Sequence, residues 1–278
     1  MIKRKEFLRT LGCSAAAAVV GSAWPAAAKP APKASLTLGL ASYTFRNFSL
    51  DDTIRFCQRL GLKRLVLKSM HLPLDASEAQ IRDAVSKIKS AGLELYGAGV
   101  IYMKTKEEVD QAFGYAKHAG LEMIIGVPNH ELLPYTEQKV KESNIRVAIH
   151  NHGPGDELYS SLNDIHEKIK NLDRRIGICI DIGHVVRINE DPVALATKYK
   201  DRIYDCHLKD VDRRDGEGKP VEVGRGLIDI PAFLKTMKRI NYTGTLAFEY
   251  EKDGDDPLAG LAESVGYVRG VMRTIDNE

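Results

Sequence analysis

Histidines and carboxylates stand at the ends of four short apolar segments in the C-terminal half of the chain. These ends carry His150-Asn151-His152, Asp181-Ile182-Gly183-His184, His207-Leu208-Lys209-Asp210 and Glu249. Imidazole nitrogens and carboxylate oxygens together form a donor set suited to a divalent ion of the first transition row or to magnesium. If the four ends meet at one cavity, they predict one divalent metal ion as a cofactor (Mn, Zn, Co, Fe or Mg).

The alternation of side chains along a strand supports this convergence. A strand turns successive side chains to opposite faces, so Thr245 and Ala247 share a face with Glu249, which then points toward a crowded interior. By the same rule His150 lies on one face with His152. Acidic side chains are rarely buried without a partner or an ion. A metal site is therefore favoured, with interstrand ion pairs and hydrogen-bonded imidazoles as the alternatives.

A repeating unit of strand plus helix positions these residues. Gly61-Leu62, Gly92-Leu93 and Gly120-Leu121 each follow an amphipathic segment and open an apolar one, at spacings of 31 and 28 residues. Thr105 and Glu108 have the spacing of a capping box, which marks a helix start. The strands are predicted over 36–45, 64–70, 93–101, 121–127, 145–151, 175–182, 202–209 and 245–250.

Eight such units predict a single α/β domain over 36–278, a (β/α)8 TIM barrel. The main alternative is an open doubly wound sheet, which normally carries G-x-G-x-x-G after a strand, and no such motif occurs here. The helix over 131–143 is the weakest prediction because Pro134 interrupts it. In a TIM barrel the active site lies at the carboxyl ends of the strands, where the histidines and carboxylates fall.

The first 28 residues have the order of an export signal: a basic start, an alanine-rich apolar stretch and Ala26-Ala27-Ala28. Arg4-Lys5-Glu6-Phe7-Leu8 is similar to a twin-arginine motif with lysine in the second position, so the twin-arginine and Sec routes both stay open. We expect cleavage of 1–28, a linker over 29–35, and export of the barrel to the periplasm or the cell exterior, with no membrane attachment after signal removal.

The charge balance argues against nucleic acid as a partner. The chain has 40 basic and 38 acidic residues, and without the first 28 residues the balance is 36 against 37, a net charge of −1. Binding to a phosphate backbone depends on basic side chains that displace its counterions. The later cysteines, Cys57, Cys179 and Cys206, lack the spacing of a disulfide framework and are expected to pack as small apolar side chains.

From about residue 36 to residue 274 the chain resembles the xylose isomerase-like barrel superfamily of sugar and sugar-phosphate isomerases and epimerases, which is related to endonuclease IV. The most specific motifs are Ile178-Cys179-Ile180-Asp181-Ile182-Gly183-His184, Asp205-Cys206-His207-Leu208-Lys209-Asp210 and Thr245-Leu246-Ala247-Phe248-Glu249. The resemblance implies that Asp181, His207 and Glu249 are metal ligands. It also implies that His184 contacts the substrate.

The fifth predicted strand departs from this family. Many family epimerases end this strand with a glutamate that ligates the metal and forms a catalytic pair with the last-strand glutamate. Here the register of that glutamate falls on His150. A neutral imidazole can still bind a metal, so we take His150 as the fourth ligand, with His152 as the alternative. The second carboxylate base is absent.

The resemblance implies a divalent-metal-dependent sugar isomerase or epimerase that removes a proton next to a carbonyl and passes through an enediolate. The predicted catalytic residues are Glu249, His152 and His184. The predicted substrate-binding residues are Lys68, His71, His184 and Lys209. The expected partner is a small-molecule sugar, and a homo-oligomer stays open.

The main alternative reaction is metal-dependent β-elimination, a lyase acting on keto-sugars or 3-keto-glycosides. The weaker alternatives are an abasic-site endonuclease, a sugar-binding barrel without catalysis, and a Schiff-base aldolase that uses Lys68 or Lys209.

Overall fold

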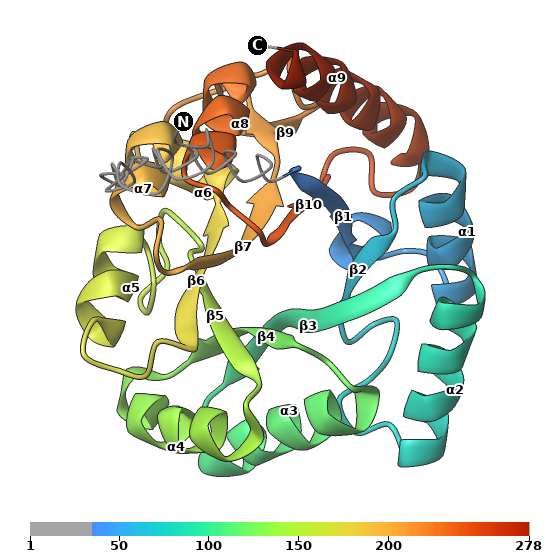
Figure 1. The fold of residues 1–278 in the computed structure, drawn as a ribbon, viewed down its shortest axis with the longest axis vertical. Helices are drawn as coiled ribbons and strands as arrows, with labels where there is room; N and C mark the ends of the chain where they lie inside the picture. The colour runs from blue at the N-terminus through green and yellow to red at the C-terminus, as the bar shows by residue number, and fades with distance from the viewer. Residues whose placement is uncertain (1–34, 278) are drawn as a thin grey trace, which may run out of the picture. The chain divides into compact units, whose positions relative to one another are not determined.

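The computed structural model describes residues 35–277, which contain a closed barrel of eight parallel strands with helices outside it (Figure 1). The order of strands around the barrel is β1-β10-β7-β6-β5-β4-β3-β2. The strands are β1 (Thr37–Ala41), β2 (Arg64–Leu67), β3 (Glu94–Met103), β4 (Met123–Pro128), β5 (Arg146–His150), β6 (Ile176–Asp181), β7 (Ile203–Leu208) and β10 (Thr245–Phe248). Each strand overlaps the range predicted for it, so the (β/α)8 barrel is confirmed.

The helices follow the strands along the chain. They are α1 (Leu50–Leu60), α2 (Glu78–Ser90), α3 (Lys106–Ala119), α4 (Leu133–Ser143), α5 (Leu162–Ile169), α6 (Ile182–Arg187), α7 (Pro192–Lys198), α8 (Ile230–Arg239) and α9 (Leu258–Asp276), with short 3-10 helices η1 (Ser42–Phe45) and η2 (His130–Leu132). The helix predicted over 131–143 is present as η2 and α4. Pro134 does not break α4 because it lies in the first turn, where its missing N–H is not needed.

Local sequence accounts for the ends of these helices. The Thr105 hydroxyl accepts the backbone N–H of Glu108 at the start of α3, as the predicted capping box requires, while the Glu108 carboxylate accepts the N–H of Lys104 instead of that of Thr105. Gly61 and Gly120 end α1 and α3 with φ of 63° and 65°, the left-handed region that favours glycine. The repeated Gly-Leu pair thus ends a helix and places a buried leucine just before the next strand.

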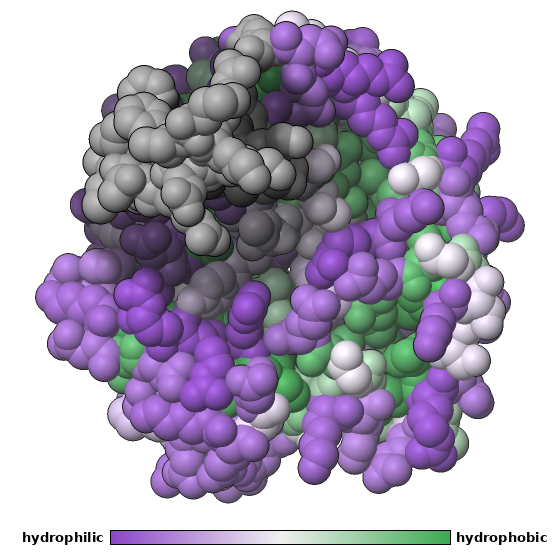
Figure 2. Space-filling model, viewed as in Figure 1, coloured by the Kyte–Doolittle hydropathy of each residue, from purple (hydrophilic) through white to green (hydrophobic). Residues whose placement is uncertain are grey.

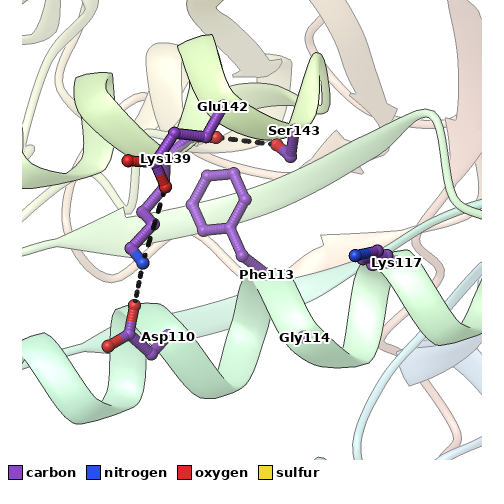
Figure 3. Close-up of a pocket in the computed structure, with 7 residues that line it drawn as sticks. All are labelled: Asp110, Phe113, Gly114, Lys117, Lys139, Glu142 and Ser143. Atoms are coloured by element: carbon purple, nitrogen blue, oxygen red, sulfur yellow. Dashed lines mark hydrogen bonds and ion pairs between the residues drawn. The ribbon is translucent and has the colours of Figure 1, made fainter.

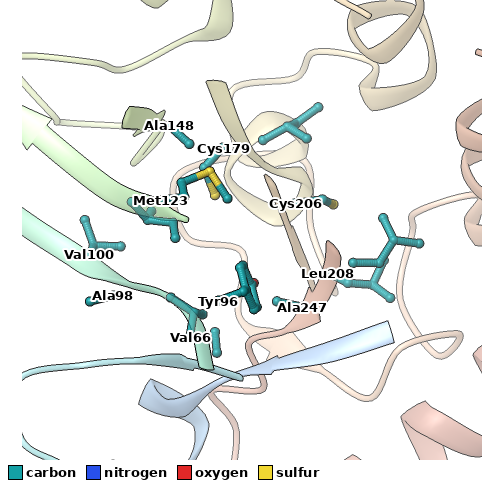
Figure 4. Close-up of a cluster of buried hydrophobic side chains, with 14 of the residues drawn as sticks. Val66, Tyr96, Ala98, Val100, Met123, Ala148, Cys179, Cys206, Leu208 and Ala247 are labelled. Carbon is teal, nitrogen blue, oxygen red and sulfur yellow. The ribbon is translucent and has the colours of Figure 1, made fainter. Parts of the chain in front are cut away.

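Apolar side chains from β2 to β7 and β10 fill the barrel and its wall (Figure 4). Tyr96 of β3 is fully buried among them, and the same interior holds small residues such as Ala247. Cys57, Cys179 and Cys206 are free and buried, as expected of small apolar side chains. On the face drawn in Figure 2, hydrophilic residues cover much of the surface, and hydrophobic ones show between the outer helices and the barrel on the side of α1 and α2.

The segment after β7 is anchored by one buried carboxylate. Asp210 accepts backbone N–H groups of Val211, Gly224, Gly226 and Ile228 at 2.9, 3.0, 3.0 and 3.1 Å. Within this segment β8 (Asp210–Val211) and β9 (Pro220–Val221) form a small antiparallel sheet. The glycine-rich segment 211–226 is therefore tied down at its base.

The predicted signal over 1–28 and all but the last residue of the predicted linker over 29–35 lie outside the described residues. Among the helices of residues 35–277, none combines the length and the hydrophobicity that crossing a membrane requires.

Candidate metal centre and active-site cavity

Four strands bring a buried cluster of two imidazoles and two carboxylates to the carboxyl end of the barrel. His150 ends β5, Asp181 ends β6, His207 lies near the end of β7, and Glu249 directly follows β10. One ligand atom from each lies within 4.8 Å of the ligand atoms of the other three. These are the four residues predicted to hold the metal, and the barrel brings all of them together.

The contacts within the cluster suit a cation. His207 Nδ1 lies 3.0 Å from Glu249 Oε2 and 3.1 Å from His150 Nε2, and His150 Nε2 lies 3.4 Å from Asp181 Oδ2. Two imidazole nitrogens that face each other and two carboxylate oxygens form the mixed donor set of a transition-metal site. The residues present therefore fit one divalent ion.

Burial and neighbouring charge set the protonation of the carboxylates. Burial opposes ionisation of Asp181, but the charges of His184 and Lys209 outweigh it and hold the pKa of this carboxyl well below its usual range. Burial likewise opposes ionisation of Glu249, but His207 and Lys209 lower its pKa well below the ordinary value. Both ligand candidates therefore carry a negative charge at neutral pH.

The two imidazoles differ. Burial lowers the pKa of His150 well below its usual value, which leaves a neutral ring able to donate a lone pair. Burial also disfavours a charged His207, but Glu249, Asp205 and Asp181 outweigh it and raise the pKa of His207.

A buried lysine also contacts the ligand carboxylates. Lys209 Nζ lies 2.9 Å from Asp181 Oδ2, 2.8 Å from Glu249 Oε2 and 3.4 Å from Glu251 Oε2, and its side chain is only 3% exposed. Burial opposes the charged ammonium, but the surrounding carboxylates raise the pKa of Lys209 well above its usual value. Lys209 is thus placed as a fixed counter-charge rather than at the cavity surface, where substrate binding was predicted.

Asn151 ties the ends of two ligand-bearing strands together. Its side-chain oxygen accepts the backbone N–H of Asp181 at 2.8 Å, and its side-chain nitrogen donates to the Asp181 carbonyl at 3.2 Å. The side chain of Asp181 in turn caps α6 by accepting the N–H of His184 at 2.9 Å. These bonds fix the end of β6 relative to the end of β5.

A cavity of about 370 Å³ opens above the cluster. It is lined by Tyr43, Lys68, Val100, Tyr102, His150, His152, His184, Glu249 and Glu251. Lys68, His152 and His184 were predicted as site residues and do line it. Tyr43, Tyr102 and Glu251 were not predicted, because a lone tyrosine or glutamate in the sequence carries no spacing signal.

His152 lies beyond the end of β5 and faces the cavity instead of completing the four-residue cluster. Its Nε2 shares a hydrogen bond of 3.0 Å with the Tyr102 hydroxyl, and the two rings stack with centroids 5.4 Å apart. Its Nδ1 lies 3.5 Å from Asp156 Oδ2. Burial lowers the pKa of His152, partly offset by Asp156. A neutral imidazole is therefore held between an acceptor and a hydroxyl at the cavity wall.

His184 and Lys68, two further predicted site residues, line the cavity and are each held by a hydrogen bond. His184 Nδ1 lies 3.3 Å from Arg187 Nη1, and burial lowers the pKa of His184 to about 4. Lys68 Nζ donates to the Val100 carbonyl at 2.6 Å. Burial lowers the pKa of Lys68, partly offset by Glu249.

His71 lies away from this cavity. Its Nδ1 is 3.0 Å from Ser42 Oγ, and its Nε2 is 3.1 Å from both Thr53 Oγ1 and the Phe45 carbonyl oxygen. The ring is buried, and its three partners belong to η1 and α1. The position fits a structural histidine and gives no support to the substrate-binding role predicted for it.

A larger groove of about 490 Å³ lies on the outside of the barrel between α3 and α4 (Figure 3). An ion pair of 2.6 Å between Lys139 Nζ and Asp110 Oδ1 crosses it beside Phe113. Its lining holds neither a histidine nor a cysteine. Its chemistry is therefore far less specific than that of the smaller cavity at the strand ends.

Comparison with known proteins agrees with this architecture. A family model described as a xylose isomerase-like TIM barrel matches residues 45–271. An inosose dehydratase of Clostridium beijerinckii is 28% identical over an alignment of 134 positions, and the match covers 41% of this chain and 43% of that protein. The match thus spans less than half of the length of that curated relative.

Solved structures share the fold over most of the described residues. The structure of an uncharacterised protein from Parabacteroides distasonis is 27% identical, has a TM-score of 0.68, and covers 85% of this chain and 99% of its own. The structure of 3-keto-D-glucoside 4-epimerase from E. coli is 15% identical, has a TM-score of 0.68, and covers 84% of this chain and 99% of its own. The latter likeness shows the fold alone.

Proposed function

Because the chain belongs to the xylose isomerase-like TIM-barrel family, we propose that it is a divalent-metal-dependent isomerase or epimerase of small sugars. One observation carries this proposal: two imidazoles and two carboxylates converge at the floor of a cavity whose walls hold acid–base groups. A divalent ion held by His150, Asp181, His207 and Glu249 would polarise a carbonyl and a neighbouring hydroxyl, which acidifies the adjacent C–H.

His152 is our choice for the group that takes the proton. It lines the cavity without belonging to the four-residue cluster, so an ion held by the cluster would not occupy its lone pair. With the ring proton on Nδ1, facing Asp156 at 3.5 Å, Nε2 is the basic atom and accepts the Tyr102 O–H at 3.0 Å. This pair supplies the second acid–base group that the absent strand-5 glutamate supplies in the family.

Other residues orient the sugar and the reacting groups. Lys68 and His184 line the cavity and present nitrogen donors to sugar hydroxyls. Lys209, paired with Asp181 and Glu249, holds these carboxylates in place from behind. Return of the proton to another carbon isomerises the sugar, and return to the opposite face of the same carbon epimerises it.

A lyase is the second candidate, because a curated relative is an inosose dehydratase. It shares the first step, removal of a proton next to a carbonyl. Loss of a hydroxyl or glycosyl group β to the carbonyl then completes an elimination. The substrates that fit this chemistry are keto-sugars and 3-keto-glycosides.

We further propose that the barrel is exported and acts on free or glycan-derived sugars. The support is the basic, apolar and small-residue order of residues 1–28. Fractionation of the producing cells, with the mature N-terminus read by mass spectrometry, tests this, and an uncleaved cytosolic chain would contradict it.

The experiment for the reaction is proton exchange in heavy water. Ketoses and 3-keto-glycosides are incubated with the ion-loaded protein, and deuterium at the carbon next to the carbonyl is followed by NMR. The wild type is expected to exchange, and His152→Asn to lose at least about 100-fold of the rate. Product identity separates isomerisation from elimination. Full exchange by His152→Asn would remove His152 from the mechanism, and no exchange on any of these substrates would contradict the proposed activity.

A further inference from the structure

A buried aspartate lies beneath the metal cluster and has no part in the mechanism above. Asp205 belongs to β7, two residues before His207, so both side chains project to the same side of the strand. Its side chain is fully buried in the barrel. Burying a carboxylate costs free energy unless it is paired or hydrogen-bonded, so the partners of Asp205 indicate what it does.

Neighbouring strands hold this carboxylate in one orientation. The Tyr96 hydroxyl of β3 donates to Asp205 Oδ1 at 3.0 Å, and Cys179 Sγ of β6 lies 3.7 Å from Oδ2. Tyr96 and Cys179 appear in the barrel interior in Figure 4. With the carboxylate held in this way, Asp205 Oδ2 lies 3.8 Å from Nε2 of His207.

The two nitrogens of His207 therefore face different partners. Nδ1 points into the cluster, toward Glu249 Oε2 at 3.0 Å and His150 Nε2 at 3.1 Å. Nε2 is buried and makes no hydrogen bond within the described residues. The Asp205 carboxylate faces it at 3.8 Å. A neutral imidazole carries its proton on one nitrogen only. Without an ion, Glu249 favours the proton on Nδ1, whereas a carboxylate facing Nε2 favours the tautomer that leaves a lone pair on Nδ1.

We propose that Asp205 is a positioning residue that keeps the proton of His207 on Nε2, so that the lone pair of Nδ1 is available to a divalent ion. Carboxylates that accept the second N–H of a ligating imidazole fix its tautomer and orientation in this way. Tyr96 acts one step further back by fixing the direction of the Asp205 carboxylate. This inference rests on the metal site of the proposed function.

The test measures tautomer and affinity instead of activity. The protein is labelled with nitrogen-15 and loaded with zinc, and long-range proton–nitrogen correlation spectra identify which nitrogen of His207 carries the proton. The wild type is expected to show the proton on Nε2 and zinc on Nδ1. A proton on Nδ1 of the zinc-loaded wild type would overturn the proposal without any variant.

Calorimetric titration with zinc then compares Asp205→Asn and Asp205→Ala with the wild type. Both are expected to weaken zinc binding by about 10- to 100-fold. Tyr96→Phe keeps the Asp205 carboxylate but removes the hydroxyl that holds its direction. We expect this variant to lose less zinc affinity than the Asp205 variants. Glu222→Gln is the matched control: Glu222 is a buried carboxylate that bonds Tyr250 and Lys252 and none of the four cluster residues, and its replacement should leave zinc affinity unchanged.

The outcomes separate this inference from the proposed function. If the wild type binds zinc through the four residues and the Asp205 variants bind it equally well, the positioning role is wrong and the metal site stands. If the wild type binds no divalent ion, the metal site itself is wrong, and the inference falls with it. Should the Asp205 variants not fold, the wild-type spectra and Tyr96→Phe still decide the question.

Discussion

At the scale of single residues, Lys209 shows how a buried charge can serve the site without touching substrate. Its ammonium pairs with two ligand carboxylates at 2.8 and 2.9 Å. Removing one member of a buried ion pair leaves an uncompensated charge, which typically costs about 3–5 kcal/mol. A divalent ion near the same carboxylates replaces part of the missing positive charge.

Lys209→Met is therefore expected to lower the free energy of unfolding of the metal-free protein by about 3–5 kcal/mol. Saturating zinc should recover part of this loss. Urea unfolding curves of the wild type and the variant, each with and without zinc, measure both effects. An equal loss with and without zinc would show that Lys209 does not share its carboxylates with the ion.

His71 gives a prediction on pH. The groups that face its ring, Ser42, Thr53 and the Phe45 carbonyl, are neutral. Burial lowers the pKa of His71 below its usual value, against the opposing backbone bonds of Phe45 and Phe48. The unfolded chain titrates near the ordinary pKa of about 6.5, so on acidification it takes up a proton before the folded protein does. The contribution of His71 to stability thus falls as the pH drops below that value.

His71→Gln is expected to lose less stability than the wild type when the pH is lowered from about 7 to about 5. Denaturation midpoints across this range, converted to free energies, provide the measurement. His118→Gln replaces a histidine that is 45% exposed and serves as the control, with the wild-type slope retained. An unchanged slope in His71→Gln would contradict a buried neutral His71.

The sequence could predict the metal cluster but not the whole cavity wall. His150, Asp181, His207 and Glu249 each lie at or next to a strand end, where topology decides their position. His71 also follows a predicted strand, yet the chain turns it toward η1 and α1. Tyr102 became a site residue only through its stacking on His152, a contact across 50 positions of the sequence that no local pattern encodes.

At the scale of elements, the segment 211–228 depends on Asp210. This carboxylate accepts four backbone N–H groups from the segment, at 2.9 to 3.1 Å. Each of these donors would otherwise need water or remain unpaired, and an unpaired buried donor costs about 1–3 kcal/mol. The segment should therefore be the part of the fold most sensitive to loss of this one side chain.

Asp210→Ala is expected to increase amide hydrogen exchange across 211–228 while β1 to β7 keep their protection. Exchange followed by mass spectrometry resolves the two regions. The matched control is Asp173→Ala, which removes a carboxylate bonded to Arg175 outside this segment. Unchanged exchange over 211–228 in Asp210→Ala would show that the segment holds itself in place.

Elements were predictable where periodicity and end signals agreed. All eight barrel strands overlap their predicted ranges, and Pro134 lies in the first turn of α4. Two features escaped prediction for physical reasons. The pairing of β3 with β4 shifts register between Ala98 and Ile101, which breaks the two-residue alternation. Strand β5 ends at His150, so alternation could not fix the direction of His152.

At the scale of the whole barrel, the closed ring of strands brings the site residues together. Parallel strands gather their carboxyl ends at one rim, so residues from β5, β6, β7 and the end of β10 meet although they are up to about 100 positions apart. The barrel interior of Figure 4 includes Tyr96 and Cys179, which contact Asp205, and Asp205 in turn faces His207 at 3.8 Å.

The most direct measurement is the divalent metal content of the purified wild type and of His207→Ala by elemental analysis after equilibration with zinc or manganese. We expect about one ion per wild-type chain and less than about one tenth of that in His207→Ala. His118→Ala, an exposed histidine outside the cluster, should keep the wild-type content. A wild type that retains no ion, or a His207→Ala variant that retains as much as the wild type, would contradict the account.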